Sequence, residues 1–322
     1  MSPIPFVALI AAATSLAAQT GTLRDLERTC FRVTDNPTPE NVALLQPLIA
    51  AETGPRLAFV KGCKLMTEEK WGPAGGEFEK AVRAEPNEPV YHFWFGRATG
   101  EQASRANPLR QPGLAKRTKG EFEKAVALDS TYVPAREGLL RYYLAAPGFL
   151  GGSIDNARKQ ATEILKLNPY RGGIALANVA VQAKDTTGLI RAHESLLSQF
   201  PDSATPYLVL IQVQQARKQW PQVWSMVDRF EKALPELRIV RYVIGRTAAE
   251  TGDQMDRGES ALRQYLQFTP KPNEPSLAAA HWRLGMIAEK RGNTAAARQE
   301  YQTAATMDPN LKQAKEALSR LK

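Results

Sequence analysis

The chain has 322 residues, more than one hydrophobic core usually serves, so it should form either two globular domains or a row of repeats. Hydrophobic residues make up 43% of it, which is enough to bury a core and argues against a wholly disordered protein. Lys and Arg number 42 against 33 Asp and Glu, and the net charge of +9 favours anionic partners. An acidic peptide, a phospholipid surface and nucleic acid all fit that charge, and so do basic side chains that only solvate helix faces.

The first 18 residues are predicted to be a signal peptide. Ile4 to Ala18 is almost wholly apolar but too short to span a bilayer comfortably, and Ser15-Leu16-Ala17 offers small residues for cleavage. The alternative is an uncleaved apolar N-terminus that packs on the first repeat. No cysteine follows closely enough for lipid attachment, so we expect a periplasmic or secreted protein without a stable membrane span.

Residues 19–54 are predicted to form an N-terminal helical cap. Thr22 to Val33 has apolar residues on one helical stripe, Asp35 to Pro39 has turn composition, and Asn41 to Ala51 again has helical periodicity. The two cysteines, Cys30 and Cys63, are 33 residues apart. Equivalent positions on neighbouring helices are typically somewhat too far apart for a disulfide, but an irregular first helix pair could bring them together. We therefore favour a disulfide over two free thiols.

From residue 55 to residue 310 the same pattern of small, aromatic and helix-terminating residues recurs about every 34 residues. The last copy is the best formed, with small, aromatic and terminating residues at Leu284, Gly285, Ala288, Gly292, Ala297, Tyr301, Ala304 and Pro309. The first copy has the corresponding residues at Gly62, Ala74, Phe78, Ala81 and Pro86. This pattern resembles the tetratricopeptide repeat (TPR) family. The resemblance implies an all-α fold, a right-handed superhelical α-solenoid of antiparallel helix pairs with about seven repeats. Residues 311–322 are predicted to be a C-terminal capping helix.

Two insertions interrupt adjacent repeats. Residues 104–114 are expected to lengthen the loop between the helices of the second repeat, and residues 145–154 the loop of the third. Insertions at equivalent points of a solenoid emerge on one face, so these two should lie side by side. Lys116, Arg117 and Lys119 give this region a basic edge.

The family resemblance also implies a binding groove, because ligands of such proteins usually lie against the first helices of successive repeats. Carrying the family positions over to this sequence gives a partner-binding set of Phe93, Arg97, Arg141, Asn178, Gln212, Tyr242, Arg246 and Trp282. Guanidinium groups beside aromatic rings suit an extended, acidic peptide. The alternative is that these arginines only pair with Glu101, Glu137 or Glu250.

Motifs for chemistry are weak. His92, His193 and His281 fall in different repeats without ligand spacing, so neither a metal site nor a cofactor is expected. Gly151-Gly152-Ser153 could cradle a phosphate at a helix N-terminus, although an ordinary turn with Ser153 as N-cap fits better. No catalytic signature stands out.

The sequence therefore predicts a non-enzymatic scaffold of the bacterial cell envelope that binds a protein or peptide in its concave groove. One alternative is an accessory subunit that docks on an envelope complex through residues 104–114 and 145–154. Another is an enzyme that acts on an anionic substrate near residues 141–153, using Arg141 with Tyr142 or Tyr143. Nucleic-acid binding is disfavoured by the expected export. The partner and the oligomeric state stay open.

Overall fold

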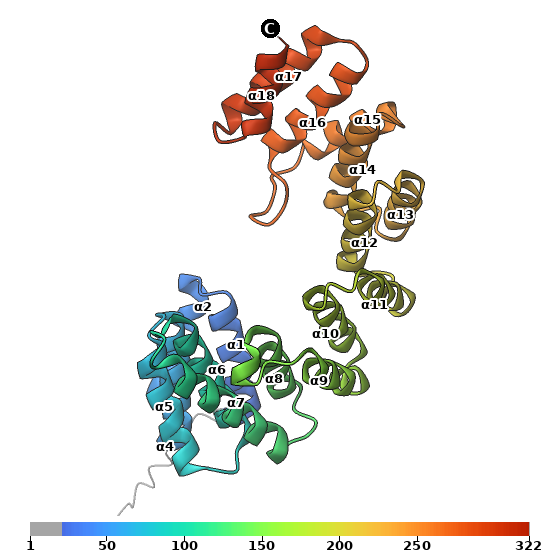
Figure 1. The fold of residues 1–322 in the computed structure, drawn as a ribbon. Coiled ribbons are helices and arrows are strands. Elements are labelled where there is room, and N and C mark those ends of the chain that lie inside the picture. The colour runs from blue at the N-terminus through green and yellow to red at the C-terminus, as the bar shows by residue number, and fades with distance from the viewer. Residues whose placement is uncertain (1–20, 322) are drawn as a thin grey trace, which may run out of the picture. The chain divides into compact units, whose positions relative to one another are not determined.

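The computed structural model describes residues 21–321, and this part of the chain is built from helices without strands (Figure 1). The predicted signal peptide lies outside the described residues. The elements are α1 (Leu23–Asp35), α2 (Pro39–Ala43), α3 (Leu45–Ala51), α4 (Gly54–Thr67), α5 (Trp71–Ala84), α6 (Pro89–Arg105), α7 (Gln111–Leu128), α8 (Val133–Ala145), the 3-10 helix η1 (Gly148–Leu150), α9 (Ile154–Leu167), α10 (Pro169–Gln182), α11 (Thr186–Gln199), α12 (Ala204–Ala216), α13 (Trp220–Ala233), α14 (Arg238–Thr251), α15 (Met255–Tyr265), α16 (Leu277–Lys290), α17 (Thr294–Met307) and α18 (Lys312–Arg320).

The predicted fold class is confirmed. Between the N-terminal helices and α18, seven helix pairs follow one another in the described chain, from α4–α5 to α16–α17. The chain divides into two compact units, one that reaches Ala175 and one that starts at Leu176. In each unit, successive helices pack on their neighbours in the order of the sequence. Among the helices between residues 21 and 321, none combines the length and apolarity that crossing a bilayer requires.

In the pairs α4–α5, α6–α7 and α16–α17, an aromatic ring of the second helix fills the space left by a glycine of the first. A Cβ atom on Gly62 would lie 2.5 Å from the Phe78 ring, and one on Gly285 would lie 2.5 Å from the Tyr301 ring. Phe122 is used twice, because Cβ atoms on Gly96 and on Gly138 would each lie 2.8 Å from it. Missing side chains thus set how closely the paired helices approach.

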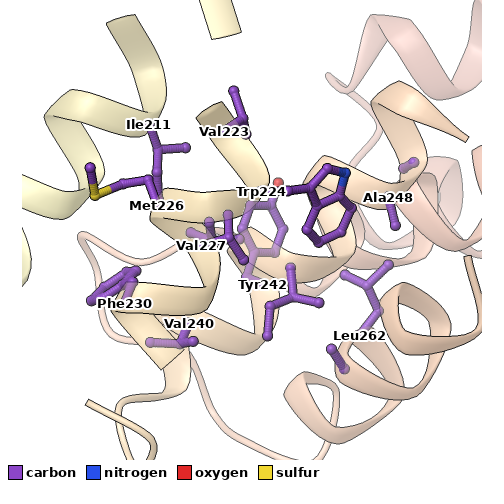
Figure 2. Packing of buried hydrophobic residues seen from close by; sticks show 14 of the residues in the cluster. Ile211, Val223, Trp224, Met226, Val227, Phe230, Val240, Tyr242, Ala248 and Leu262 are labelled. Atoms are coloured by element: carbon purple, nitrogen blue, oxygen red, sulfur yellow. The ribbon is translucent and has the colours of Figure 1, made fainter. Parts of the chain in front are cut away.

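The two units have separate cores. In the first, the rings of Phe59, Phe78, Tyr91, Phe93 and Trp94 lie in a continuous aromatic cluster. The second is filled mainly by aliphatic side chains between α11 and α16, with Trp224 and Tyr242 among them (Figure 2). A smaller cluster of Ala297, Tyr301 and Ala317 seats α18 on the last pair.

Two predicted segments differ in detail from the structure. The helix expected over Asn41–Ala51 is divided at Leu44 into α2 and α3. Pro47 explains the division, because it cannot donate to the carbonyl of Ala43 and its ring would clash there.

The first insertion is mostly helix, whereas a longer loop was predicted. Ser104 and Arg105 end α6, residues 111–114 begin α7, and only residues 106–110 remain as a connection. Pro112 was a misleading signal, since proline is well tolerated in the first turn of a helix. The second insertion does remain a loop, with η1 at its centre.

The glycine contacts can be tested within one helix pair. Replacing Gly96 with Ala forces a methyl group into the Phe122 ring, so the free energy of unfolding should fall by about 1–3 kcal/mol. A methyl group on Gly120 of α7 would meet no atom within 4 Å, so Gly120→Ala should instead raise that free energy by up to about 1 kcal/mol. Denaturant unfolding followed by circular dichroism measures both, and equal effects of the two substitutions would contradict the packing described.

The α6–α7 pair also contains a buried histidine that joins the two helices through a hydrogen bond. His92 Nδ1 lies 2.6 Å from Glu121 Oε2 and its Nε2 lies 2.9 Å from the Pro86 carbonyl, so both ring nitrogens face acceptors. Burial opposes the charged ring, but the bonds to Glu121 and Pro86 outweigh it and raise the pKa of His92 above its ordinary value.

A raised folded-state pKa means that the contribution of His92 to stability is complete below about pH 6.5 and is lost as the pH rises through the folded value. Burial lowers the pKa of His193, so protonation of His193 as the pH falls lowers the stability of the folded state. We therefore expect the stability difference between the natural chain and His92→Gln to shrink between about pH 6 and pH 9. Denaturant titrations at both ends of this range check it; a difference that stays constant would argue against a charged His92.

Candidate binding groove in the N-terminal unit

Helix α1 lies across the first helices of consecutive repeats of its unit, so it does more than cover the end of the row. Cys30 is bonded to Cys63 on α4, with the two Cα atoms 5.5 Å apart. The Phe31 ring packs on α6, 5.7 Å from the ring of Phe93 and 4.9 Å from that of Trp94. The second contact involves Phe93, one of the predicted partner-binding residues.

A buried carboxylate fixes the other face of α1. Glu27 is only 5% exposed, and it accepts a hydrogen bond from Trp94 Nε1 at 3.3 Å and another from the Tyr132 hydroxyl. Arg24 forms an ion pair with Glu27 at 3.1 Å and places its guanidinium 4.3 Å from the centre of the Tyr132 ring. Burial and the Glu27 charge raise the pKa of Tyr132 well above its ordinary value, so this hydroxyl stays a donor. A buried charge with this many partners holds α1 in one place.

Beside α1 the unit has an open groove of about 760 Å³. Phe31 and Asp35 of α1 form one wall, α6 and α8 form the sides, and Phe93 with Phe122 forms an aromatic base. Both insertions contribute to its rim, the first through Ser104 and Gln111 and the second through Pro147 and Leu150. The prediction that the insertions lie side by side therefore agrees with the lining of this groove.

The charges that line the groove are almost all paired. Arg97 bonds Asp35 at 2.8 Å, Arg171 bonds Glu137 at 2.6 Å, and Glu101 bonds Arg105 at 2.6 Å. Arg141 is the exception. Its side chain is exposed, and no residue between 21 and 321 forms a hydrogen bond or ion pair with its guanidinium. The pairs to Glu101, Glu137 and Glu250 that the sequence offered as an alternative therefore do not form with Arg97 or Arg141. Glu250 pairs with Arg283 at 3.1 Å.

The loop before α9 is closed to an anion. The backbone N–H groups of Gly151, Gly152 and Ser153 donate to the carbonyls of Gly148, Pro147 and Tyr143, at 2.9, 3.1 and 2.9 Å. Ser153 is an N-cap, as the more ordinary interpretation of its sequence predicted. The Tyr142 hydroxyl donates to the Leu150 carbonyl at 2.5 Å, and that of Tyr143 to Glu123 at 3.5 Å. These groups already serve the loop and the helix pair.

The predicted partner-binding residues fall into two sets. Phe93, Arg97 and Arg141 come together in the groove of the first unit. In the second unit, Asn178 and Gln212 are exposed on α10 and α12. Tyr242 is 7% exposed and packs on Tyr265 with ring centres 5.4 Å apart, so it belongs to the core.

The other two residues of the second set are also engaged. Arg246 donates to Gln215 at 2.8 Å, and burial lowers the pKa of its guanidinium. Trp282 carries the Arg283 guanidinium 4.1 Å from its ring centre and lines a smaller pocket of about 440 Å³ beside α18.

The sequence did not identify Phe31, Asp35, Phe122 or Tyr132 as parts of a site. Phe122 was recognised as a repeat aromatic, but its contact with Gly138 of the next repeat and its place in the lining of the groove were not foreseen. His281 bonds Glu300 at 2.6 Å, and residues 21–321 contain no cluster of His, Cys, Asp or Glu suited to a metal ion.

Among solved structures, the chain is similar to a tetratricopeptide repeat protein from Parabacteroides merdae, with 14% identity, a TM-score of 0.47 and 83% of this chain and 98% of that chain covered. Pseudomonas aeruginosa PilF is similar at 12% identity and a TM-score of 0.47, with 83% and 97% covered. The C-terminal part of a TPR repeat-containing protein from Cytophaga hutchinsonii is similar at 13% identity and a TM-score of 0.46, with 91% and 99% covered. No protein-family model and no curated protein matches the chain. Likenesses this distant say nothing of what the chain binds.

The attachment of α1 gives a local prediction. Cys30 and Cys63 are both buried, and their bond closes a loop with a sequence separation of 33 residues. Replacing both with Ala should cost about 2–4 kcal/mol of local stability. Hydrogen exchange should then speed up in α1 while α16 and α17 exchange as before. Unchanged protection of α1 would mean that the Glu27 bonds alone hold this helix.

Proposed function

We propose that the chain is a binding scaffold that holds an extended peptide segment of a partner protein in the groove between α1, α6 and α8. The support is the unpaired Arg141 at the side of a hollow whose base is aromatic. Phe31, Pro147 and Leu150 of the lining offer surface to apolar side chains, and the guanidinium offers a bidentate fork to a carboxylate. No chemistry by the chain itself is part of this proposal.

The ion pairs formed by the other charged residues of the groove restrict the kind of ligand that can bind. A strongly acidic peptide would need several open cations, but Arg97 and Arg171 already hold carboxylates of the chain. One open guanidinium suits a mainly apolar segment with a single acidic group, either a side chain or a terminal carboxylate. Asp35 on Arg97 shows within the same groove how such a carboxylate would lie.

We place this activity in the cell envelope. The apolar N-terminal residues support export, and the Cys30–Cys63 bond is typical of proteins from oxidising compartments. Both observations bear on the compartment and leave the identity of the partner open.

Binding of defined peptides tests the groove. An array of extended octapeptides, each with apolar residues around one Asp, should bind the chain more tightly than the same peptides with Asn. Arg141→Ala should weaken the Asp peptides by about 1.5–3 kcal/mol, which is about 10- to 150-fold, because it removes a charged hydrogen-bond donor. Lys159→Ala is the matched control, since Lys159 is an exposed cation of α9 away from the groove. Equal binding of the Asp and Asn peptides would refute the proposal.

A companion variant changes selectivity within the same assay. Asp35→Asn removes the carboxylate that occupies Arg97 and leaves a second open guanidinium in the groove. Peptides with two acidic residues should gain affinity for this variant relative to peptides with one. Should both classes respond equally, Arg97 would not face the ligand.

A further inference from the structure

Two apolar side chains project from the first unit into solvent. Leu109 is 93% exposed and Phe149 is 84% exposed, whereas the other exposed large apolar residues of the described chain lie between 36% and 59%. Leu109 belongs to the short connection 106–110, and Phe149 is the central residue of η1. Each of the two insertions therefore ends in one unburied apolar tip.

The tips are held by ordered loops. Arg110 N–H donates to Asn107 Oδ1 at 3.1 Å, and Gln111 Nε2 donates to the Ala103 carbonyl at 3.3 Å, which fixes the first loop. The second is fixed by the Tyr142 hydroxyl on Leu150 and by Gly152 N–H on Pro147. Residues next to both tips, Gln111 in the first loop and Leu150 in the second, line one groove.

The surroundings of the tips are basic. Between Gln102 and Gly120 the sequence has five basic residues and no acidic one: Arg105, Arg110, Lys116, Arg117 and Lys119. Arg105, Arg117 and Lys119 form ion pairs with Glu101, Glu79 and Glu123. Arg110 and Lys116 are exposed and form no ion pair within residues 21–321. Between Gly138 and Ile154, the only charged residue is Arg141.

We propose that these tips dock the protein on an anionic phospholipid surface. Leu109 and Phe149 enter the boundary between headgroups and acyl chains, and Arg110 and Lys116 contact lipid phosphates. Apolar burial and attraction to anionic headgroups add in such binding, and this region supplies both.

A lipid surface fits the geometry better than a protein surface does. Protein hot spots lie in well-packed, desolvated centres of an interface, whereas these two side chains come from separate loops and are each almost fully exposed. A fluid bilayer accepts separate protruding side chains without a matching pocket. Peripheral docking also needs no membrane-crossing helix, and it would bring the groove mouth to the membrane surface independently of what the groove binds.

Co-sedimentation with vesicles tests the proposal. Vesicles of phosphatidylcholine alone are compared with vesicles of phosphatidylcholine and phosphatidylglycerol. Residues 1–18 are mostly apolar and could bind vesicles themselves. All variants are therefore prepared with the same N-terminal residue, which is verified by N-terminal sequencing. The natural chain should bind the anionic vesicles at least tenfold more tightly, and added salt should weaken this binding.

Matched variants separate the tips from general stickiness. Leu109→Ser with Phe149→Ser should lower the partition onto anionic vesicles about tenfold or more, while Val181→Ser with Met307→Ser, which removes two other exposed apolar side chains, should leave it unchanged. Arg110→Gln with Lys116→Gln should lower it several-fold. Lys312→Gln with Lys315→Gln, on exposed positions of α18, is the charge control.

Two outcomes would overturn the proposal. The first is binding to anionic vesicles that the tip variant retains in full. The second is absence of vesicle binding together with self-association of the natural chain, seen by sedimentation velocity and lost in the tip variant. That result would assign the tips to a second copy of this chain.

Discussion

The rest of this protein depends on one kind of contact, an aromatic ring that packs against a glycine of the neighbouring helix. Phe78 against Gly62, Phe122 against Gly96 and Tyr301 against Gly285 fill space that a larger residue than glycine would occupy. These contacts set how closely the helices of three pairs approach each other.

In the first unit these contacts have a second effect, because Phe122 meets a glycine on each side. Gly138 lets the ring pack directly against α8, and the buried ring is part of the lining of the groove. Helix α1 then closes one side of that groove with Phe31 and supplies the carboxylate for Arg97. Among the described residues that line the groove, Arg141 keeps a guanidinium without an ion pair. This is the feature on which the proposed binding of an apolar segment with one negative group rests.

Much of the fold followed from local signals. Helix starts were marked by Thr22, Ser153 and Asn293, which act as N-caps, and the small and aromatic positions gave the pairing. The break at Leu44 was also encoded locally, by Pro47, but it was missed because the apolar periodicity continues across it. Pro112 misled in the opposite direction, since a proline in the first turn looks like a loop residue. The disulfide between Cys30 and Cys63 was expected only if the first helices depart from the regular repeat, and the two Cα atoms do lie within bonding distance, 5.5 Å apart.

The course of α1 could not be foreseen, because no local pattern encodes it. The Arg97–Asp35 pair spans 62 residues and the Arg24–Asp129 pair spans 105, and which residues meet over such distances depends on the path of the whole unit. Tyr242 illustrates the same difficulty at short range. Its position along α14 matches the family pattern, yet its ring turns toward Tyr265 and joins the core.

The hydrogen bond from Tyr132 to Glu27 joins residues 105 positions apart, in an architecture whose contacts are otherwise mostly between neighbours in sequence. As the chain is synthesised, α1 is made before α4 to α7, whereas Tyr132 is made after them. Helix α1 can therefore complete its contacts only after two further repeats have been made. While they are synthesised, Glu27 lacks one of its hydrogen-bond donors and α1 lacks part of its final environment.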